Sequence, residues 1–437
     1  MTGAVAASDP HYKALQSRYA VEEAGRYGAL VVPNGNANRP YHRWFHLKEG
    51  FSCELLPEVL RECGLGEVGI RLVDPYAGVG TSIISAFEQQ KPVEALGFER
   101  NPFLQFAAAT KARALGGETC DDFHGFVHRV VDASRDIIAG PAPQLSTFSR
   151  REYFNEEDLG ELLCLRSAIN TIEGTSLTKD LARLCLAGSL EPVSSLRRDG
   201  RALRRVVDKP HAEPLAEFLR RCAIVAHDLW LRDKSESSGR VRLADGRDPG
   251  EHLPCDFLAD LVVFSPPYPN NIDYTEVYKL ETWFLQFVQT QEDFREQRLE
   301  TVRSHPSVKF PDEYYAEANG YKEEFDKAVT PIVDSIPSDE DRRWRERLVK
   351  GYFDDMLKTL AKANGYLKHD GWLVYIVGNS LHGSGDKKFL IAADLVMARL
   401  AEVVGFEVAS VKVARRPKRR AEAFPFLRES VVFLRKS

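Results

Sequence analysis

The sequence predicts an α/β fold with a doubly wound, mostly parallel sheet that is interrupted by largely helical insertions. Residues 70–73, apolar except for Arg71, are predicted to form a strand that leads into a glycine-containing loop and a helix. A second apolar run ends at Glu99, and a third, at 261–264, has four apolar residues in succession, as in a strand buried on both faces of a parallel sheet. Such strands, alternating with helical segments, indicate βαβ units.

The composition is that of a globular protein with two or three units, or one domain with large insertions. The chain has 437 residues, is 43% hydrophobic and 28% charged, and carries a net charge of −5. Seven cysteines without a C-x-x-C pair or a Cys/His cluster predict neither a disulfide framework nor a metal site. The chain has no apolar stretch of a membrane span's length and no signal pattern at its start, so we expect a cytoplasmic protein without a membrane segment.

The first βα unit carries a loop of the nucleotide-binding type. Gly78 and Gly80 lie between the strand at 70–73 and a helix expected at 81–89, and they allow the close backbone approach that a ligand at a helix N-terminus requires. Glu99 follows at the distance where an acidic residue binds the hydroxyls of a ribose. The loop lacks the third glycine of the dinucleotide fingerprint and a Gly-Lys-Ser/Thr sequence, so NAD and nucleoside triphosphates fit less well.

A stiff loop follows the third apolar run. Pro266, Pro267 and Pro269 cannot donate ladder hydrogen bonds, so Ser265–Tyr268 is predicted to leave the carboxyl end of the strand in an extended conformation. Open α/β sheets bind their ligands at this end. A hydroxyl, carbonyls beside prolines and an aromatic face suit the exocyclic amine of a base. The alternative is a proline-rich turn whose tyrosine is only packed.

The other segments are predicted mostly from helical spacing. The aromatic and basic stretch at 40–52 either packs its aromatic side chains into the core or forms the rim of a ligand pocket. A strand followed by acids is expected at 240–249, where Asp245, or alternatively Asp248, is placed to accept a hydrogen bond from an adenine amine. We further expect helices at 12–27, 54–64, 102–115, 272–287, 352–367 and 390–404, and strands within 369–380, 406–414 and 430–436.

Two arginine-rich stretches are candidates for phosphate contacts. The first, at 190–210, lies in the predicted helical insertion, and the second, at 415–428, connects the last two predicted strands near one edge of the sheet. A solvated charge run is the alternative for the first. The candidate nucleic-acid-binding residues are Arg197, Arg198, Arg201, Arg204, Arg205, Arg415, Arg416, Arg419 and Arg420.

Three motifs resemble those of the S-adenosylmethionine-dependent amino-methyltransferases of DNA, especially the cytosine-N4 type. DPYAGVGT at 74–81 is similar to the family's cofactor loop, and GFERNP at 97–102 to its ribose-binding acidic motif. SPPY at 265–268 is similar to the catalytic motif, which more often begins with Asp or Asn in adenine-specific relatives. The stretch at 44–52 resembles the extra cofactor-side motif, whereas ADGRD near Asp245 departs from the family's usual Gly-Asp-Ala-Arg order.

The resemblance implies a Rossmann-like class I methyltransferase sheet with S-adenosyl-L-methionine as cofactor. It also implies methyl transfer to the exocyclic amine of a flipped base in double-stranded DNA, with cytosine N4 favoured by Ser265, and a cognate restriction nuclease or defence-system subunits as partners. The implied catalytic residues are Ser265, Pro266, Pro267 and Tyr268, the last stacking on the base. The implied cofactor-binding residues are Phe51, Ser52, Asp74, Pro75, Tyr76, Gly78, Gly80, Thr81, Glu99, Arg100, Asn101 and Asp245.

Other interpretations stay open. The chain could be an adenine-N6 DNA methyltransferase, an RNA or tRNA amino-methyltransferase with a similar prolyl-prolyl-aromatic loop, or a non-catalytic subunit of a defence complex. Cys255 follows a proline as a cytosine-C5 nucleophile does, but it precedes the strand and is better interpreted as an ordinary residue. His382, in a glycine-rich stretch, is expected to be a surface or substrate-contact group rather than a base.

These assignments divide the chain into a core and its insertions. The core is expected in three pieces, and the first insertion is the candidate for target recognition. The predicted units are an N-terminal extension (1–39), the cofactor-binding core (40–115), a helical insertion (116–240), the core with the catalytic loop (241–289), a second insertion (290–345) and the C-terminal core (346–437).

Overall fold

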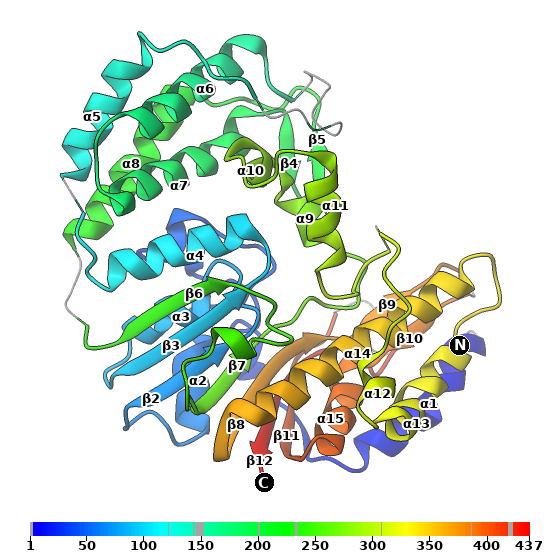
Figure 1. The fold of residues 1–437 in the computed structure, drawn as a ribbon. Coiled ribbons are helices and arrows are strands. Elements are labelled where there is room, and N and C mark those ends of the chain that lie inside the picture. The colour runs from blue at the N-terminus through cyan, green and yellow to red at the C-terminus, as the bar shows by residue number, and fades with distance from the viewer. Residues whose placement is uncertain are drawn as a thin grey trace.

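The computed structural model describes residues 3–120, 122–142, 145, 153–199, 202–231, 235–306, 308–385, 387–417 and 423–437. Within this part of the chain, eight strands form the central sheet, in the order β1-β11-β12-β8-β7-β2-β3-β6 (Figure 1). These strands are β1 (Val21–Glu23), β2 (Ile70–Asp74), β3 (Val93–Glu99), β6 (Ser238–Leu243), β7 (Ala259–Phe264), β8 (Leu367–Gly378), β11 (Phe406–Arg415) and β12 (Glu429–Lys436).

The strand order confirms the predicted doubly wound sheet. The five strands β6, β3, β2, β7 and β8 are parallel to one another. Strand β12 is antiparallel to both β8 and β11, and β1 is parallel to β11. From β2 the chain adds β3 and β6 on one side, and later β7 and β8 on the other. This reversal places the ligand crevice of an open α/β sheet at the carboxyl ends of β2 and β7.

Strand β7 shows why the contiguous apolar run predicts a central strand. Alternate side chains of a strand point to opposite faces of the sheet. Leu261 and Val263 belong to one hydrophobic core, whereas Val262 and Phe264 belong to another. Because both faces are covered by helices, every position in this run is buried.

Helices cover the two faces of the sheet in two groups. One face is packed by α2 (Leu55–Glu62) and α3 (Thr81–Phe87), together with part of α4 (Pro102–Leu115). The other is packed by α1 (Gly3–Gln16), α13 (Lys322–Asp334), α14 (Arg342–Tyr366) and α15 (Ala393–Val403). Helices α2 and α4 confirm the predictions at 54–64 and 102–115.

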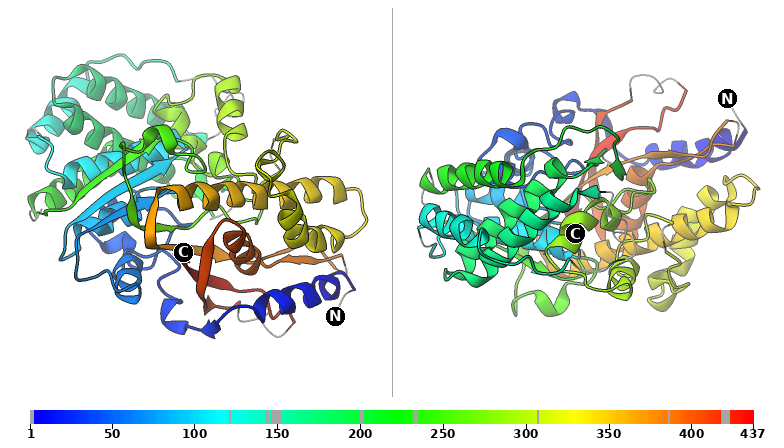
Figure 2. Two further views of the ribbon diagram at one scale, coloured as in Figure 1. Left: turned by 60° about the horizontal axis from the view of Figure 1, so that its bottom comes forward. Right: turned by 90° about the horizontal axis from the view of Figure 1, so that it is seen from above.

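A third core belongs to a helical layer that rests on α4 (Figure 1). The layer lies at one end of the molecule and α13 and α1 at the other, as all the views show (Figures 1 and 2). Its elements are α5 (Phe123–Ser134), α6 (Glu156–Thr171), α7 (Ser176–Val193), the hairpin of β4 (Leu196–Arg198) and β5 (Leu203–Arg205), α8 (Pro214–Trp230), α9 (Tyr274–Val277) and α10 (Lys279–Phe284).

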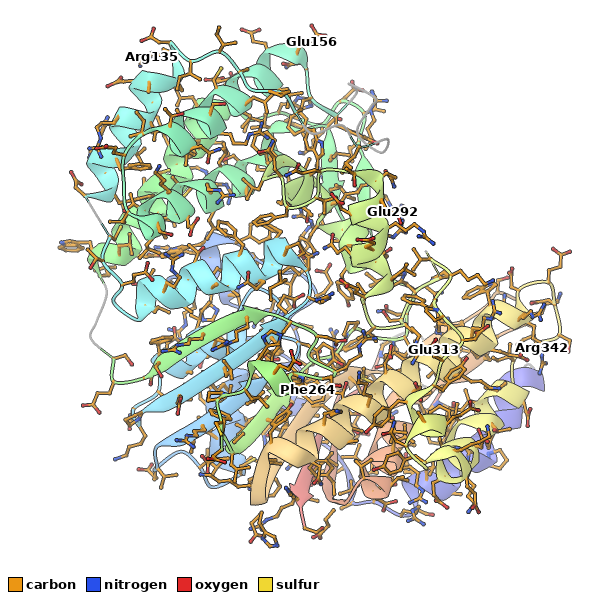
Figure 3. All side chains as sticks on the ribbon, in the orientation of Figure 1. Arg135, Glu156, Phe264, Glu292, Glu313 and Arg342 are labelled. Atoms are coloured by element: carbon orange, nitrogen blue, oxygen red, sulfur yellow. The ribbon has the colours of Figure 1, made fainter. Side chains whose placement is uncertain are left out.

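The short elements complete the described chain. Glu292, on α11, lies beside the helical layer, whereas Glu313, just before α12, lies beside α14, so the second polar segment bridges the two ends of the molecule (Figure 3). None of the described helices combines the length and apolar character needed to cross a membrane. The remaining elements are α11 (Gln291–Leu299), α12 (Tyr315–Ala318), β9 (Ser380–His382), β10 (Phe389–Ile391), and the 3-10 helices η1 (Gly25–Tyr27), η2 (Asn36–Asn38), η3 (His42–Trp44) and η6 (Gly250–His252).

Two local predictions are wrong. The helix expected at 12–27 ends at Gln16, and Val21–Glu23 instead forms a strand that pairs with β11 through Val21 and Val411. The helix expected from residue 390 begins at Ala393, because the preceding residues form β10 and pair with β9. The insertion is mostly helical, as expected, and part of its arginine-rich stretch forms the β4–β5 hairpin.

Candidate active site

A cavity lies at the carboxyl ends of the parallel strands, at the switch point of the sheet. Together with its opening to solvent, it has about 860 Å³ of space between the atoms. Three sequence motifs meet in its wall, from the loops after β2, β3 and β7. The lining residues are Leu47, Glu49, Pro75, Tyr76, Gly78, Glu99, Arg100, Asn101, Leu104, Asp245, Gly246, Arg247, Ser265, Pro266, Pro267, Tyr274, Thr275, Glu300, Thr301, Val302, Ser304 and His305.

The glycine loop is folded around the buried carboxylate of Asp74. This carboxylate accepts hydrogen bonds from the hydroxyl of Ser82 and, at 2.9 Å, from the backbone N–H of Tyr76. Burial raises the pKa of Asp74 to about 7, although these hydrogen bonds oppose the shift. Gly80 has a φ of 85° at the N-terminus of α3. Asp74, Gly80 and Thr81 therefore shape the loop, while Pro75, Tyr76 and Gly78 line the cavity.

Glu99 ties the second motif to this loop. Its Oε2 accepts from the Gly78 N–H at 2.9 Å and its Oε1 from the Asn101 N–H at 2.7 Å. Burial raises the pKa of Glu99 above its ordinary value. The Asn101 side-chain oxygen caps α4, whereas its Nδ2 is buried and has no hydrogen-bond partner among the described residues. Glu99 and Asn101 thus present acceptor and donor groups at one side of the cavity.

Asp245, rather than Asp248, faces the cavity. Arg247 donates to both Asp245 oxygens, each at 2.9 Å, and although burial raises the pKa of Asp245, this guanidinium holds it below its ordinary value. Asp248 is exposed and pairs with Lys358 and Lys362. Of the two acids left open by the sequence, the structure places only Asp245 at the cavity.

The proline loop brings Ser265, Pro266 and Pro267 to the cavity but not Tyr268. The Tyr268 ring lies against Gly378, where a Cβ atom would be 2.8 Å from the ring's Cε2. Its hydroxyl accepts from Ser265 Oγ at 3.4 Å and donates to Glu429 Oε1 at 2.7 Å. The tyrosine is therefore held beside the loop and not along the cavity wall.

His382 supports the same loop from behind. It lies on β9 and is buried, unlike the surface group expected from the sequence. Its Nε2 is 2.7 Å from the carbonyl oxygen of Pro269, which also accepts from Ser380 Oγ at 2.8 Å. Burial lowers the pKa of His382 to about 4. Cys255, by contrast, is exposed before β7, at the amino end of the strand opposite the cavity.

The structure places Phe51 and Ser52 outside the cavity. Phe51 is buried in the core beneath α2 and α3, and Ser52 Oγ donates to the Asn34 carbonyl at 2.8 Å. The same stretch instead contributes Leu47 and Glu49, the latter accepting from Tyr278 OH at 2.7 Å. The stretch at 40–52 therefore does contribute to the rim of the cavity, but through Leu47 and Glu49 and not through Phe51 and Ser52, because the chain turns into the core after Glu49.

The arginines of the first stretch differ in burial. Arg198 is buried, pairs with Glu191 at 2.8 Å and with Glu281, and lies over the Tyr278 ring, so it is not available to a phosphate. Arg204 is exposed and pairs with Asp199. Arg197 and Arg205 are also exposed, and Arg201 lies outside the described residues.

The arginines of the second stretch also differ in burial. Arg415 pairs with Glu429, and Arg416 pairs with Glu23 at 2.7 Å. Arg428 is buried against Asp394 at 2.7 Å and belongs to the core. Arg419 and Arg420 lie outside the described residues.

Residues 300–305, from the second polar segment, form a wall that the sequence did not indicate. Arg247 donates to the carbonyls of Glu300 and Thr301 at 2.9 and 3.2 Å, and His305 Nε2 lies 3.0 Å from Thr301 Oγ1. On the far side, Arg303 bonds to the carboxylate of Asp355 on α14. No motif marks this wall in the sequence, since long-range ion pairs hold it in place. Among the described residues, no cluster of three or more His, Cys, Asp or Glu could hold a metal ion.

Comparison with solved structures returns proteins of low similarity. The chain aligns with TrmN from Thermus thermophilus at 10% identity and a TM-score of 0.29, covering 89% of this chain and 49% of that one. It aligns with the rRNA methyltransferase aviRa from Streptomyces viridochromogenes at 12% identity and a TM-score of 0.32, covering 94% and 96%.

Sequence comparison finds relatives along most of the chain, although no family model matches it. The chain is 24% identical over 442 residues to the type II methyltransferase M.BsoBI of Geobacillus stearothermophilus, covering 91% of this chain and 85% of that protein. It is 23% identical over 422 residues to the type II methyltransferase M.AvaI of Nostoc sp., covering 88% and 83%. Over about nine tenths of its length, the chain is therefore similar to type II methyltransferases.

Proposed function

We propose that the chain is an S-adenosylmethionine-dependent DNA methyltransferase that modifies the exocyclic N4 amine of cytosine at specific sites. The observation that carries this proposal is the meeting of three motifs in one cavity: Gly78 of the glycine loop, Glu99 of the acidic motif and Ser265 of the proline loop. The similarity of the chain to type II methyltransferases over most of its length supports site-specific methyl transfer to DNA.

The residues of the cavity fit the cofactor. The two backbone N–H groups that bond to Glu99 leave acceptor capacity on both of its oxygens, which suits a pair of ribose hydroxyls. The buried Nδ2 of Asn101 supplies a donor without a partner, and Asp245 supplies an acceptor for an adenine amine. Bound S-adenosylmethionine supplies a methyl group on a positively charged sulfonium. Gly78, Glu99, Asn101 and Asp245 are the residues that we expect to hold it.

The proline loop suits the nucleophile. A cytosine amine is a poor nucleophile because its lone pair is delocalised into the ring. Ser265 Oγ and the Pro266 carbonyl can accept hydrogen bonds from its two N–H groups, which favours a nitrogen whose lone pair is free to attack. Attack then depends on positioning more than on a strong base. The target must first leave the duplex to reach such a cavity.

The proposed substrate is double-stranded DNA, and the proposed partner is a restriction nuclease of the same specificity. The first stretch has three exposed arginines on the β4–β5 hairpin among its described residues, and we propose them for phosphate contacts: Arg197, Arg204 and Arg205. Cytosine is preferred to adenine because the loop begins with Ser265 where adenine-specific relatives more often have Asp or Asn. We propose a cytoplasmic site of action, and the reaction itself requires no metal.

The test is mass spectrometry of nucleosides after DNA and, in parallel, RNA are incubated with the purified protein and methyl-labelled cofactor. We expect labelled N4-methylcytosine from DNA. N6-methyladenine would keep the mechanism and overturn the base assignment, while label only in RNA would overturn DNA as the substrate.

Ser265→Ala separates catalysis from binding. It should leave cofactor affinity unchanged and slow methyl transfer by about 100-fold or more, as the loss of one preorganised hydrogen bond does in other active sites. Cofactor binding without methyl transfer by the wild-type chain would instead favour a non-catalytic subunit of a defence complex.

A further inference from the structure

A continuous chain of hydrogen-bonding groups leads from the proline loop to the surface. Ser265 lines the cavity, and its Oγ donates to Tyr268 OH at 3.4 Å, while Tyr268 OH donates to Glu429 Oε1 at 2.7 Å. The other Glu429 oxygen pairs with the guanidinium of Arg415, whose side chain is 52% exposed. Four side chains thus connect the reacting end of the cavity with solvent.

The direction of these bonds suits the movement of a proton away from the cavity. A hydroxyl has one hydrogen to donate and two lone pairs that accept. Because Ser265 and Tyr268 both donate toward Glu429, the lone pairs of Ser265 Oγ remain available to an N–H in the cavity. Each hydroxyl can therefore receive a proton from the cavity side while it gives up its own on the other side.

The surrounding structure fixes this chain. Gly378 leaves the space that the Tyr268 ring occupies, and Gly378 pairs directly with Glu429 across strands β8 and β12. Pro269, next to the tyrosine, is held through its carbonyl by Ser380 and His382. Glu429 is 8% exposed, so its carboxylate is shielded on the side of the tyrosine.

Tyr268 is suited to passing a proton rather than holding a charge. Burial and the neighbouring Glu429 carboxylate raise the pKa of Tyr268 well above its ordinary value, so the phenol stays neutral. The geometry also gives the tyrosine a task other than stacking, since its ring does not line the cavity.

We propose that Glu429 accepts, through Tyr268 and Ser265, the proton that the target amine loses during methyl transfer. This inference rests on the proposed function and deepens it. The nitrogen lone pair forms the bond to the methyl carbon while the carbon–sulfur bond breaks and its electron pair stays on sulfur. The amine proton passes to Ser265 Oγ, the serine proton to Tyr268 and the tyrosine proton to Glu429, which becomes a carboxylic acid. The methylated amine is left neutral.

A carboxylate is a sufficient base for this step. The proton becomes strongly acidic only as positive charge develops on the nitrogen, so it leaves in concert with bond formation. Glu429 then returns its proton to water on the side of Arg415, which is partly exposed. Ser265 is the catalytic residue of this chain, and Tyr268 and Glu429 act through it.

The test compares Tyr268→Phe, Glu429→Gln and the double variant in single-turnover methyl transfer. The probe is unmethylated, amplified DNA of mixed sequence with labelled S-adenosylmethionine. Each single variant should slow transfer by about 100-fold, within the range of general acid–base effects, and the double variant should be no slower than either. Glu429→Asp should recover part of the rate. Cofactor Kd should stay within about twofold of wild type, because the cofactor-binding residues are untouched.

Matched controls separate this role from a structural one. Glu407→Gln neutralises an exposed carboxylate on β11 and should leave the rate unchanged. Tyr268→Phe keeps the ring, so it carries the test even if Glu429→Gln fails to fold. Wild-type rates in both single variants, or losses that multiply in the double variant, would overturn the relay. Absence of methyl transfer by the wild-type protein would instead overturn the proposed function on which the relay rests.

Discussion

The cavity has two walls that are built by different physics. The motif wall, at 75–78, 99–101, 245–246 and 265–267, follows the carboxyl ends of the central strands and is shaped by backbone: glycines, prolines and a capped helix N-terminus. The opposite wall, at 300–305, is held by guanidinium groups that reach it from elsewhere, above all Arg247.

This difference decides what can be inferred from a sequence. Backbone conformation depends on residues close together in the chain, so the motif wall leaves a local pattern. The 300–305 wall depends on partners such as Asp355, about 50 positions away on α14, which leave no local pattern. Substitutions in the two walls should therefore destabilise the protein for different reasons. In the motif wall the cause is backbone strain or a buried group, and in the 300–305 wall it is a charge left without its partner.

Arg247→Ala should have the largest effect, because it removes the residue that joins the two walls. Asp245 loses its guanidinium partner and Asp355 keeps only Arg303, and breaking a buried pair costs about 3–5 kcal/mol of unfolding free energy. Cofactor affinity should fall with it, measured by calorimetric titration beside denaturant unfolding. Arg399→Ala, which breaks an ion pair with Glu402 on α15, is the control that should leave affinity unchanged. Unchanged affinity in Arg247→Ala would show that the walls are independent.

Asp74→Asn should change how the free energy of unfolding depends on pH, because the Asp74 carboxylate is buried inside the motif wall. Burial raises the pKa of Asp74 to about 7, whereas the unfolded chain has its ordinary, much lower value. Its contribution to stability is therefore full below about pH 4 and is lost as the pH rises through 7. Relative to Asp74→Asn, the wild-type protein should lose about 2–4 kcal/mol over this range, measured from urea unfolding at several pH values. Parallel pH curves for the two proteins would contradict the prediction.

The fold was predictable where burial is continuous. The run at 261–264 is a central strand because both of its faces are covered, and the helices at 54–64 and 102–115 follow from apolar spacing. The edge strand β1 was not predictable, because Val21 pairs with Val411, almost four hundred residues later. No local pattern records a partner at that distance.

In the first arginine-rich stretch, the sequence could indicate a turn of the backbone but not which arginine side chains are exposed. Asp199-Gly200 is a dipeptide typical of tight hairpins and was the available signal for β4–β5. Once a strand is recognised, its alternation requires Arg197 and Arg198 to point to opposite faces, and the structure buries the second. A count of arginines therefore overstates the positive charge that a stretch offers to a ligand.

Gly246→Ala tests the motif wall by strain. A Cβ atom at this position would lie 1.7 Å from the carbonyl oxygen of Pro75, so the backbone must move. Such overpacking costs about 1–3 kcal/mol, and it should also weaken cofactor binding because both residues line the cavity. Gly250→Ala is the matched control, since its nearest neighbour would be 3.9 Å away. Equal melting temperatures and cofactor affinities for the two variants would show that the backbone around Gly246 can move to accept a Cβ atom without loss of stability.

Glu300→Gln should have the smallest effect, although Glu300 belongs to the same wall as the carbonyls that Arg247 holds. Its side chain pairs with Arg100, and the two are 51% and 33% exposed, so the pair contributes about 0–1 kcal/mol. The Glu300 carbonyl remains available to Arg247 after the substitution. We therefore expect unfolding free energy within about 1 kcal/mol of wild type, and a difference that shrinks at high salt because exposed charges are screened. If Glu300→Gln lowered the free energy of unfolding as much as Arg247→Ala does, the exposed ion pair with Arg100, and not the buried Arg247 network, would be what stabilises this wall.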